Sequence, residues 1–269
     1  AIILAIRNFT NPLVAYPLGE NKPLRDLTTL DAELILCDLD IVEKRIGKVE
    51  ANLKKRQDKE DLFEYDLLVK CKETLDQERP LRELNFDLDA SRKIKGFQFL
   101  TAKPLLIVLN IDEDKLSEQK EIAASFREQL HHPYKGTEVV AMAAKLEMEL
   151  GQLADNDKRE FMMDLGLVEL GSTSIPKLIT NLLGLITFYT MSQEEVRART
   201  IPEGTKAIQA AGSVHTDMER GFIRAEVISF EDLETCGSMS AGKEQGLLRL
   251  EGKDYLIRDG DIVHFRFHV

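Results

Sequence analysis

The chain has 269 residues, of which 43% are hydrophobic and 31% are charged. These values exclude a disordered or collagen-like chain and predict a folded protein of one large or two modest domains. The net charge of −11 argues against a protein whose whole surface binds a polyanion, because affinity for phosphates comes from Lys and Arg.

Targeting and metal-binding signals are lacking in the sequence. No apolar run approaches the roughly 20 residues that span a bilayer, and no secretory leader opens the chain, so we expect a cytoplasmic protein without a membrane segment. The three cysteines, Cys37, Cys71 and Cys236, lie far apart and form no C-x-x-C pair. We therefore expect neither a disulfide framework nor a metal site.

Three short apolar runs predict a parallel sheet. The run Ile2–Ile6 is typical of a strand buried on both faces, and comparable runs follow at 104–110 and 138–142. Because the chain begins without Met and inside the first of these runs, we expect a fragment that starts within a domain. Helical stretches predicted at 117–131 and 144–163, the latter with a polar break at 155–159, complete an α/β pattern.

A long helical insertion separates the first two strands. Apolar residues recur at alternating steps of four and three, the period of a coiled-coil seam. The members of this seam are Ile35, Leu39, Val42, Ile46, Val49 and Leu53. A polar patch at 57–61 can turn the chain, and a weaker stripe then runs to the stop at Pro80. This second stripe comprises Leu62, Tyr65, Leu68, Val69 and Leu75. The pattern predicts an antiparallel helical hairpin.

The expected tip of the hairpin is basic. Between residues 44 and 59 there are seven basic and two acidic residues, a local balance of +5. The basic ones are Lys44, Arg45, Lys48, Lys54, Lys55, Arg56 and Lys59. This cluster is either a solvated helix face or a contact surface for phosphates.

The last third of the chain predicts a separate α+β domain. We expect strands at 185–190 and 194–200, a short helix, and a closing hairpin that turns at Asp259-Gly260.

The segment 237–243 matches the spacing of a phosphate-binding loop, but Glu244 stands where Ser or Thr should hold Mg²⁺. We therefore interpret this segment as an exposed helix ending at Gly246.

Several longer segments resemble one family. These are "LLIVLNIDE", "EVVAMAAKLEMELGQL", "LITFYTMSQEEVRARTIPEGTKAIQAAGSVHTDMERGFIRAEV" and "EGKDYLIRDGDIVHFRF". Together they resemble the YchF (Obg-like ATPase) family of P-loop nucleotidases. The resemblance implies a partial Ras-like nucleotidase domain at 1–27 and 98–184, a coiled-coil insertion at 28–97, and a β-grasp (TGS) domain at 185–269.

The resemblance also implies a site for the nucleotide base. Asn110, Ile111 and Glu113 occupy the motif that is N-K-x-D in GTPases and N-x-x-E in this family. A Glu in place of Asp disturbs the pair of hydrogen bonds to guanine, which is consistent with the family's preference for ATP. The segment Ala143-Ala144-Lys145 is similar to the family's S-A-K segment beside the base, although Ala143 lacks the hydroxyl group.

The family's phosphate loop, its Mg²⁺-binding threonine and its D-x-P-G switch have no counterpart in this sequence, so we expect this chain alone to be catalytically inactive. By resemblance, the intact parent uses ATP or GTP with Mg²⁺ and binds the ribosome or its RNA, with no sequence-specific DNA binding. The alternative is a non-catalytic adapter, in which the hairpin and the TGS domain bind RNA or protein.

The cluster His215, Asp217, Glu219 and Arg220 has the composition of an active site, yet it lies within the part that resembles a TGS domain. We interpret His215 and Asp217 as residues that fix a turn through side-chain bonds to the backbone, rather than as a general base or metal ligands.

Overall fold

A computed structural model describes residues 1–16, 19–56, 58–130, 136–191 and 195–268. The chain divides into two compact units, Ala1–Leu182 and Leu183–Val269. We describe each unit by itself.

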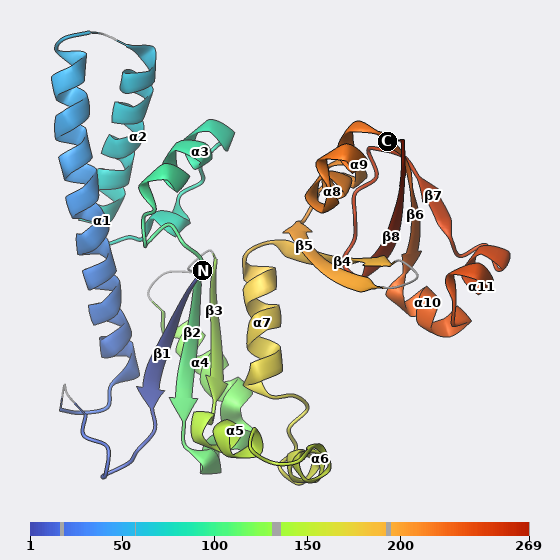
Figure 1. The fold of residues 1–269 in the computed structure, drawn as a ribbon. Helices are drawn as coiled ribbons and strands as arrows, with labels where there is room; N and C mark the ends of the chain where they lie inside the picture. The colour runs from blue at the N-terminus through green and yellow to red at the C-terminus, as the bar shows by residue number, and fades with distance from the viewer. Residues whose placement is uncertain (17–18, 57, 131–135, 192–194, 269) are drawn as a thin grey trace. The chain divides into compact units, whose positions relative to one another are not determined.

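Unit 1 contains a three-stranded parallel sheet with the order β1-β2-β3 (Figure 1). Its strands are β1 (Ile2–Asn8), β2 (Leu105–Ile111) and β3 (Thr137–Met142). The sheet confirms the three-strand expectation. In the central strand β2 all residues but one are buried, because its two faces are covered and both of its edges are paired.

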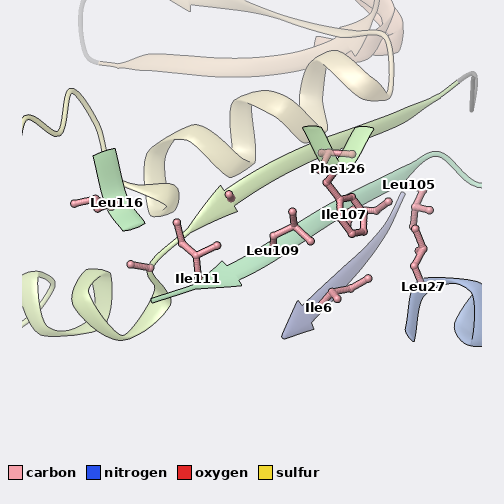
Figure 2. Close-up of a cluster of buried hydrophobic side chains, with 11 residues drawn as sticks. Ile6, Leu27, Leu105, Ile107, Leu109, Ile111, Leu116 and Phe126 are labelled. Atoms are coloured by element: carbon pink, nitrogen blue, oxygen red, sulfur yellow. The ribbon is translucent and has the colours of Figure 1, made fainter. Parts of the chain in front are cut away.

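A cluster of buried hydrophobic residues covers one face of this sheet. Four alternate residues of β2 point into it, because side chains alternate across a strand. Figure 2 shows them: Leu105, Ile107, Leu109 and Ile111. Helix α4 (Gln119–Glu128) adds Phe126 to the same cluster, and the first turns of α1 (Pro23–Leu53) add Leu27.

The expectation that β1 is buried on both faces is wrong. Ile6 is 2% exposed, whereas Ile3 is 49% exposed and Ala5 is exposed as well. Ile3 and Ala5 point away from the core that contains Ile6, since successive side chains of a strand face opposite sides. β1 is therefore a half-buried edge strand in the part of the chain that the structure describes.

The helical insertion is a hairpin of α1 and α2 (Lys59–Asp76), which pack along each other (Figure 1). Ile35, Val42 and Val49 are buried in a shared cluster, and the other three seam residues of α1 pack against it. α1 starts at Pro23, so it runs without a break through the predicted boundary at residue 28. Gln57, part of the expected turn, lies outside the described residues.

On α2 the predicted stripe is confirmed only in part, at Leu68 and Leu75, which are buried. Leu62 is 53% exposed, and the buried face instead follows steps of three and four from Glu64. That face consists of Glu64, Leu67, Leu68, Cys71, Thr74 and Leu75. A buried acid, thiol and hydroxyl therefore replace apolar residues at positions that hydrophobicity alone does not identify.

A buried carboxylate fastens the segment that returns from the hairpin. Asp38 on α1 is 0% exposed and accepts hydrogen bonds from the amides of Leu100 (2.8 Å) and Thr101 (2.7 Å) and from the Thr101 hydroxyl (2.6 Å). Beside it, Arg82 pairs with Asp31 at 3.1 Å. This cluster joins α1 to the chain three residues before the Pro104-Leu105 entry into β2.

A second buried carboxylate holds three helices of the insertion together. Glu64 of α2 is 2% exposed and accepts hydrogen bonds from Arg45 of α1 and from Lys93 (3.1 Å) of α3 (Leu88–Phe97). Burial alone would raise the pKa of Glu64, but the two cations lower it below its ordinary value of 4.5.

The remaining helices of unit 1 follow β3. They are α5 (Ala144–Leu150), α6 (Asp155–Asp164) and α7 (Gly171–Leu182). The expected break at 155–159 is misplaced, because the chain leaves the helix at 151–154 and Asp155 begins α6. Acidic residues are favourable in the first turn of a helix, so this polar run starts a helix and does not interrupt one. The 117–131 segment begins as a 3₁₀ turn (Glu113–Glu118) and continues as α4.

Unit 2 has a five-stranded mixed sheet with the order β5-β4-β8-β6-β7. Its elements are β4 (Leu185–Met191), β5 (Val196–Pro202), α8 (Ala207–Val214), α9 (Thr216–Arg220), β6 (Phe222–Ser229), α10 (Phe230–Cys236), α11 (Met239–Glu244), β7 (Arg249–Glu251) and β8 (Asp261–Phe267). A buried cluster that includes Phe188, Val227 and Phe265 forms its core together with Ala207, Ala210 and Ala211 of α8.

The closing hairpin expected around Asp259-Gly260 is wrong. Gly260 makes a turn with φ of 80°, but β8 then pairs with β6 and, in parallel, with β4, while β7 lies on the far side of β6. A local turn signal identifies where a strand begins and not which strand it joins. Residue 194, the expected start of β5, lies outside the described residues.

Asp38→Ala should lower the free energy of unfolding of unit 1 by about 2–4 kcal/mol, because it leaves buried donors of Leu100 and Thr101 without an acceptor. Urea denaturation followed by circular dichroism measures this loss. The matched control is Asp40→Ala, which removes an exposed carboxylate whose ion-pair partner among the described residues is Lys44. Equal effects of the two substitutions would contradict the assignment.

Glu64→Gln should destabilise unit 1 by about 1–3 kcal/mol at pH 7, since it removes a buried anion from two partly exposed cations. Because the pKa of Glu64 is lowered in the folded state, its stabilising effect is present above pH 4.5 and is lost as the pH falls through the folded pKa. Urea denaturation of both proteins from pH 7 to pH 3 should show the difference closing at the acidic end. A difference that does not change with pH would refute the ionic role.

Candidate functional site

The candidate site lies at the carboxyl ends of the three parallel strands of unit 1. In the register of the sheet, Asn110 at the end of β2 is opposite Arg7 on β1 and Met142 on β3. The strands point the same way in Figure 1, so the loops that leave them meet at one edge. Open α/β sheets bind ligands at this edge. Here a cavity of about 800 Å³ lies among residues 9–14, residues 110–115 and Lys145.

Two predicted segments of the site are brought together by one hydrogen bond. The side-chain oxygen of Asn110 accepts the N–H of Ala144 at 3.1 Å, so the loop after β2 is joined to the start of α5. Ala143 is 1% exposed, which leaves it a packing role and places the half-buried Ala144 nearer the surface. Asn110 therefore fixes the relative position of the two loops.

Ile111 is positioned differently from the other predicted residues. Its side chain is 3% exposed and belongs to the hydrophobic core beside Leu109 (Figure 2). Any contact between Ile111 and a ligand at this edge must come from its backbone.

Glu113 and Lys145 form an ion pair at the cavity. The Nζ atom of Lys145 lies 3.0 Å from Oε1 of Glu113 and 3.7 Å from Glu149, one turn further along α5. The pKa of Lys145 is raised above its ordinary 10.5, chiefly by the hydrogen bond to Glu113. The pair is a second connection between the loop after β2 and α5.

The loop after β1 forms another wall of the cavity, which the sequence analysis missed. The amide of Thr10 donates to both carboxylate oxygens of Asp112, at 3.1 and 3.0 Å. The guanidinium of Arg7 donates to the carbonyls of Phe9 (3.2 Å) and Val14 (3.0 Å) and lies 4.4 Å from the centre of the Phe9 ring. The position of this loop directly after a strand of the same sheet was the signal that could have identified it.

The predicted basic cluster lies on the helical hairpin, and all seven of its side chains are exposed. Three of them have acidic neighbours: Lys44 pairs with Asp40 at 2.6 Å, Arg45 with Glu64, and Arg56 lies 3.8 Å from Asp58.

The other four cations of the cluster have no ion pair with any residue in the described ranges. They are Lys48, Lys54, Lys55 and Lys59. Lys54 and Lys55 lie in the connection between α1 and α2, and Lys59 is the first residue of α2. The end of the hairpin therefore presents unpaired positive charge.

In unit 2, His215 has the structural role that the sequence predicts. Its Nδ1 accepts the N–H of Asp217 at 3.2 Å and caps α9. The segment 237–243 is a helix end followed by α11, with Gly237 in a left-handed conformation and Ser238 capping the new helix. Within the described part of the chain, no group of three His, Cys, Asp or Glu side chains could hold a metal ion.

Comparison with known proteins identifies relatives of this chain. Residues 185–268 match the family described as "YchF-GTPase_C: Protein of unknown function (DUF933)". The "Ribosome-binding ATPase YchF" of Bacillus subtilis (strain 168) is 40% identical over 271 residues, which cover 100% of this chain and 73% of that protein. The protein of the same name from Escherichia coli O157:H7 is 38% identical over 275 residues, with the same coverage.

Solved structures agree as well. The Schizosaccharomyces pombe YchF GTPase superimposes with a TM-score of 0.84 at 27% identity, over 99% of this chain and 72% of that one. A GTP binding protein from Pyrococcus horikoshii OT3, at 18% identity and a TM-score of 0.56, shares the fold. The identity along the whole chain shows that it belongs to the YchF family.

Proposed function

We propose that this chain is the base-binding and ribosome-binding part of a nucleotide-dependent ATPase. Relatives that match along the whole chain are named ribosome-binding ATPases, and a related structure is named a GTPase. A ribosome-binding role places the protein in the cytoplasm. No helix among the described residues has the length and apolar character needed to cross a membrane.

The observation that carries the nucleotide proposal is the bond from Ala144 to Asn110 at the edge of the 800 Å³ cavity. It brings the segments 110–113 and 143–145 to one place, as a base-reading site requires. We assign base contacts to Asn110, Glu113, Ala144 and Lys145, a backbone contact to Ile111 and a packing role to Ala143. ATP is the expected nucleotide and GTP the weaker one, since Glu113 replaces the guanine-reading Asp.

We assign the contact with ribosomal RNA to the tip of the hairpin. Unpaired cations there can displace counterions from phosphates, even though the whole chain carries a net charge of −11. The β-grasp (TGS) assignment of unit 2 belongs to the same proposal, and its mixed sheet covered by α8 supports it.

Magnesium accompanies the nucleotide in enzymes of this class. Among the described residues, no group of three His, Cys, Asp or Glu side chains could hold a metal ion by itself. We therefore derive no step through the metal.

Asn110→Ala should weaken ATP binding by about tenfold or more, because it removes the acceptor that joins the two base loops. Calorimetric titration with ATP and Mg²⁺ measures this effect. Lys120→Ala on the exposed side of α4 is the control and should bind as the unmodified chain does. If the unmodified chain gives no binding, the nucleotide proposal fails and the non-catalytic adapter stands.

Replacing Lys48, Lys54, Lys55 and Lys59 with Gln should weaken binding to purified ribosomes and reduce the slope of log K against log[salt] by up to about 3. Co-sedimentation at several salt concentrations gives both values. The matched control replaces Lys95, Lys120, Lys243 and Lys253, four exposed lysines outside the tip, and so makes the same change in net charge. Equal losses in the two variants would show a general charge effect and overturn the assignment.

A further inference from the structure

The ion pair between Lys145 and Glu113 has a geometry that bears on nucleotide choice. We propose that Lys145 is a specificity-determining residue, which holds the Glu113 carboxylate and so keeps it from accepting hydrogen bonds from a guanine base. This inference rests on the proposed function, because it concerns the same cavity. It gives Lys145, which already lines the proposed base site, a further role that it exerts through Glu113.

The pair is placed to have this effect. Glu113 lies in the loop after β2 and Lys145 in the first turn of α5, and both line the cavity. Their 3.0 Å contact involves Oε1 of Glu113, one of the two oxygens that a guanine fork would require. Glu149 is the second partner of Lys145 at 3.7 Å, too long for a hydrogen bond of ordinary strength, so Glu113 is the principal partner.

The two purine bases respond to this pair in opposite ways. Guanine presents a ring N–H and an amino group, both donors, toward the position that the GTPase Asp occupies, and a free carboxylate there is favourable. Adenine presents a ring nitrogen with a lone pair at the corresponding position, and a free carboxylate repels it. The ammonium group of Lys145, which pairs with Glu113, lessens the repulsion of adenine and competes with guanine for the carboxylate oxygens of Glu113. The pair therefore favours adenine over guanine.

The solvent exposure of Glu113 and Lys145 limits how strongly their ion pair can change the preference between ATP and GTP. The side chains of Glu113 and Lys145 are 45% and 69% exposed, so water screens both the pair and its competitor. We expect Lys145→Met to change the ratio of the dissociation constants for GTP and ATP by about tenfold in favour of GTP, the size of one screened hydrogen bond to a charged acceptor.

The experiment is an equilibrium titration of the chain with ATP and, separately, with GTP, both with Mg²⁺. Binding is followed through the amide NMR signals of Asn110 and Ala144, which report on the site itself. Lys145→Met should strengthen GTP binding and weaken ATP binding. Lys145→Arg keeps the charge and the pairing with Glu113, so its ratio should stay near that of the unmodified chain.

Two further variants separate the proposed role from a structural one. Glu149→Gln removes only the longer contact of Lys145 and should leave the ratio unchanged. Glu113→Gln added to Lys145→Met removes the released carboxylate, so the gain in GTP binding should disappear. If both nucleotides bind at Asn110 and Ala144 but Lys145→Met leaves the ratio unchanged, the role of Lys145 is refuted and the proposed function stands. If neither nucleotide shifts these signals, both are refuted.

Discussion

The architecture of unit 1 depends on the buried carboxylate of Asp38. A helical insertion that leaves and re-enters a sheet must return at one defined point, or the next strand is displaced from its register. Asp38 defines that point because it satisfies two backbone amides and one hydroxyl group of the returning chain in the interior. An unsatisfied buried donor is costly, so a shift of the returning segment that breaks these bonds raises the free energy of the fold.

Patterns that depend on hydrophobicity alone could be predicted well. β2 is an unbroken apolar run, and a strand paired on both sides requires nothing else, so its position followed from composition. The seam of α1 followed from its period. The buried face of α2 followed only in part, at Leu68 and Leu75, because Glu64 and Thr74 are buried through ion pairs and hydrogen bonds. The turn signal predicted a hairpin of β7 and β8, but β6 lies between these strands in the sheet.

The candidate site was predictable where it follows a strand directly. Asn110 and Glu113 could be placed there because parallel strands end at one edge, whereas the place of Ala144 was implied only by the family resemblance. The wall formed by residues 9–14 also follows a strand, β1, so its place could have been predicted in the same way, but its shape could not. Its shape comes from Arg7, whose guanidinium is satisfied by carbonyls of the same loop, and no spacing rule encodes that contact. The burial of Ile111 likewise shows that a motif position need not present its side chain.

Strand β2 connects two features that lie at its opposite ends. Thr101, bound by Asp38, precedes it closely, and Asn110 is its penultimate residue. Seven residues of extended chain span roughly 23 Å, and hydrogen bonds on both sides make such a strand stiff along its length. A rotation of the hairpin where Asp38 binds Thr101 would therefore act on the same strand that positions Asn110. The root of the hairpin and the proposed base site are therefore joined by a single strand.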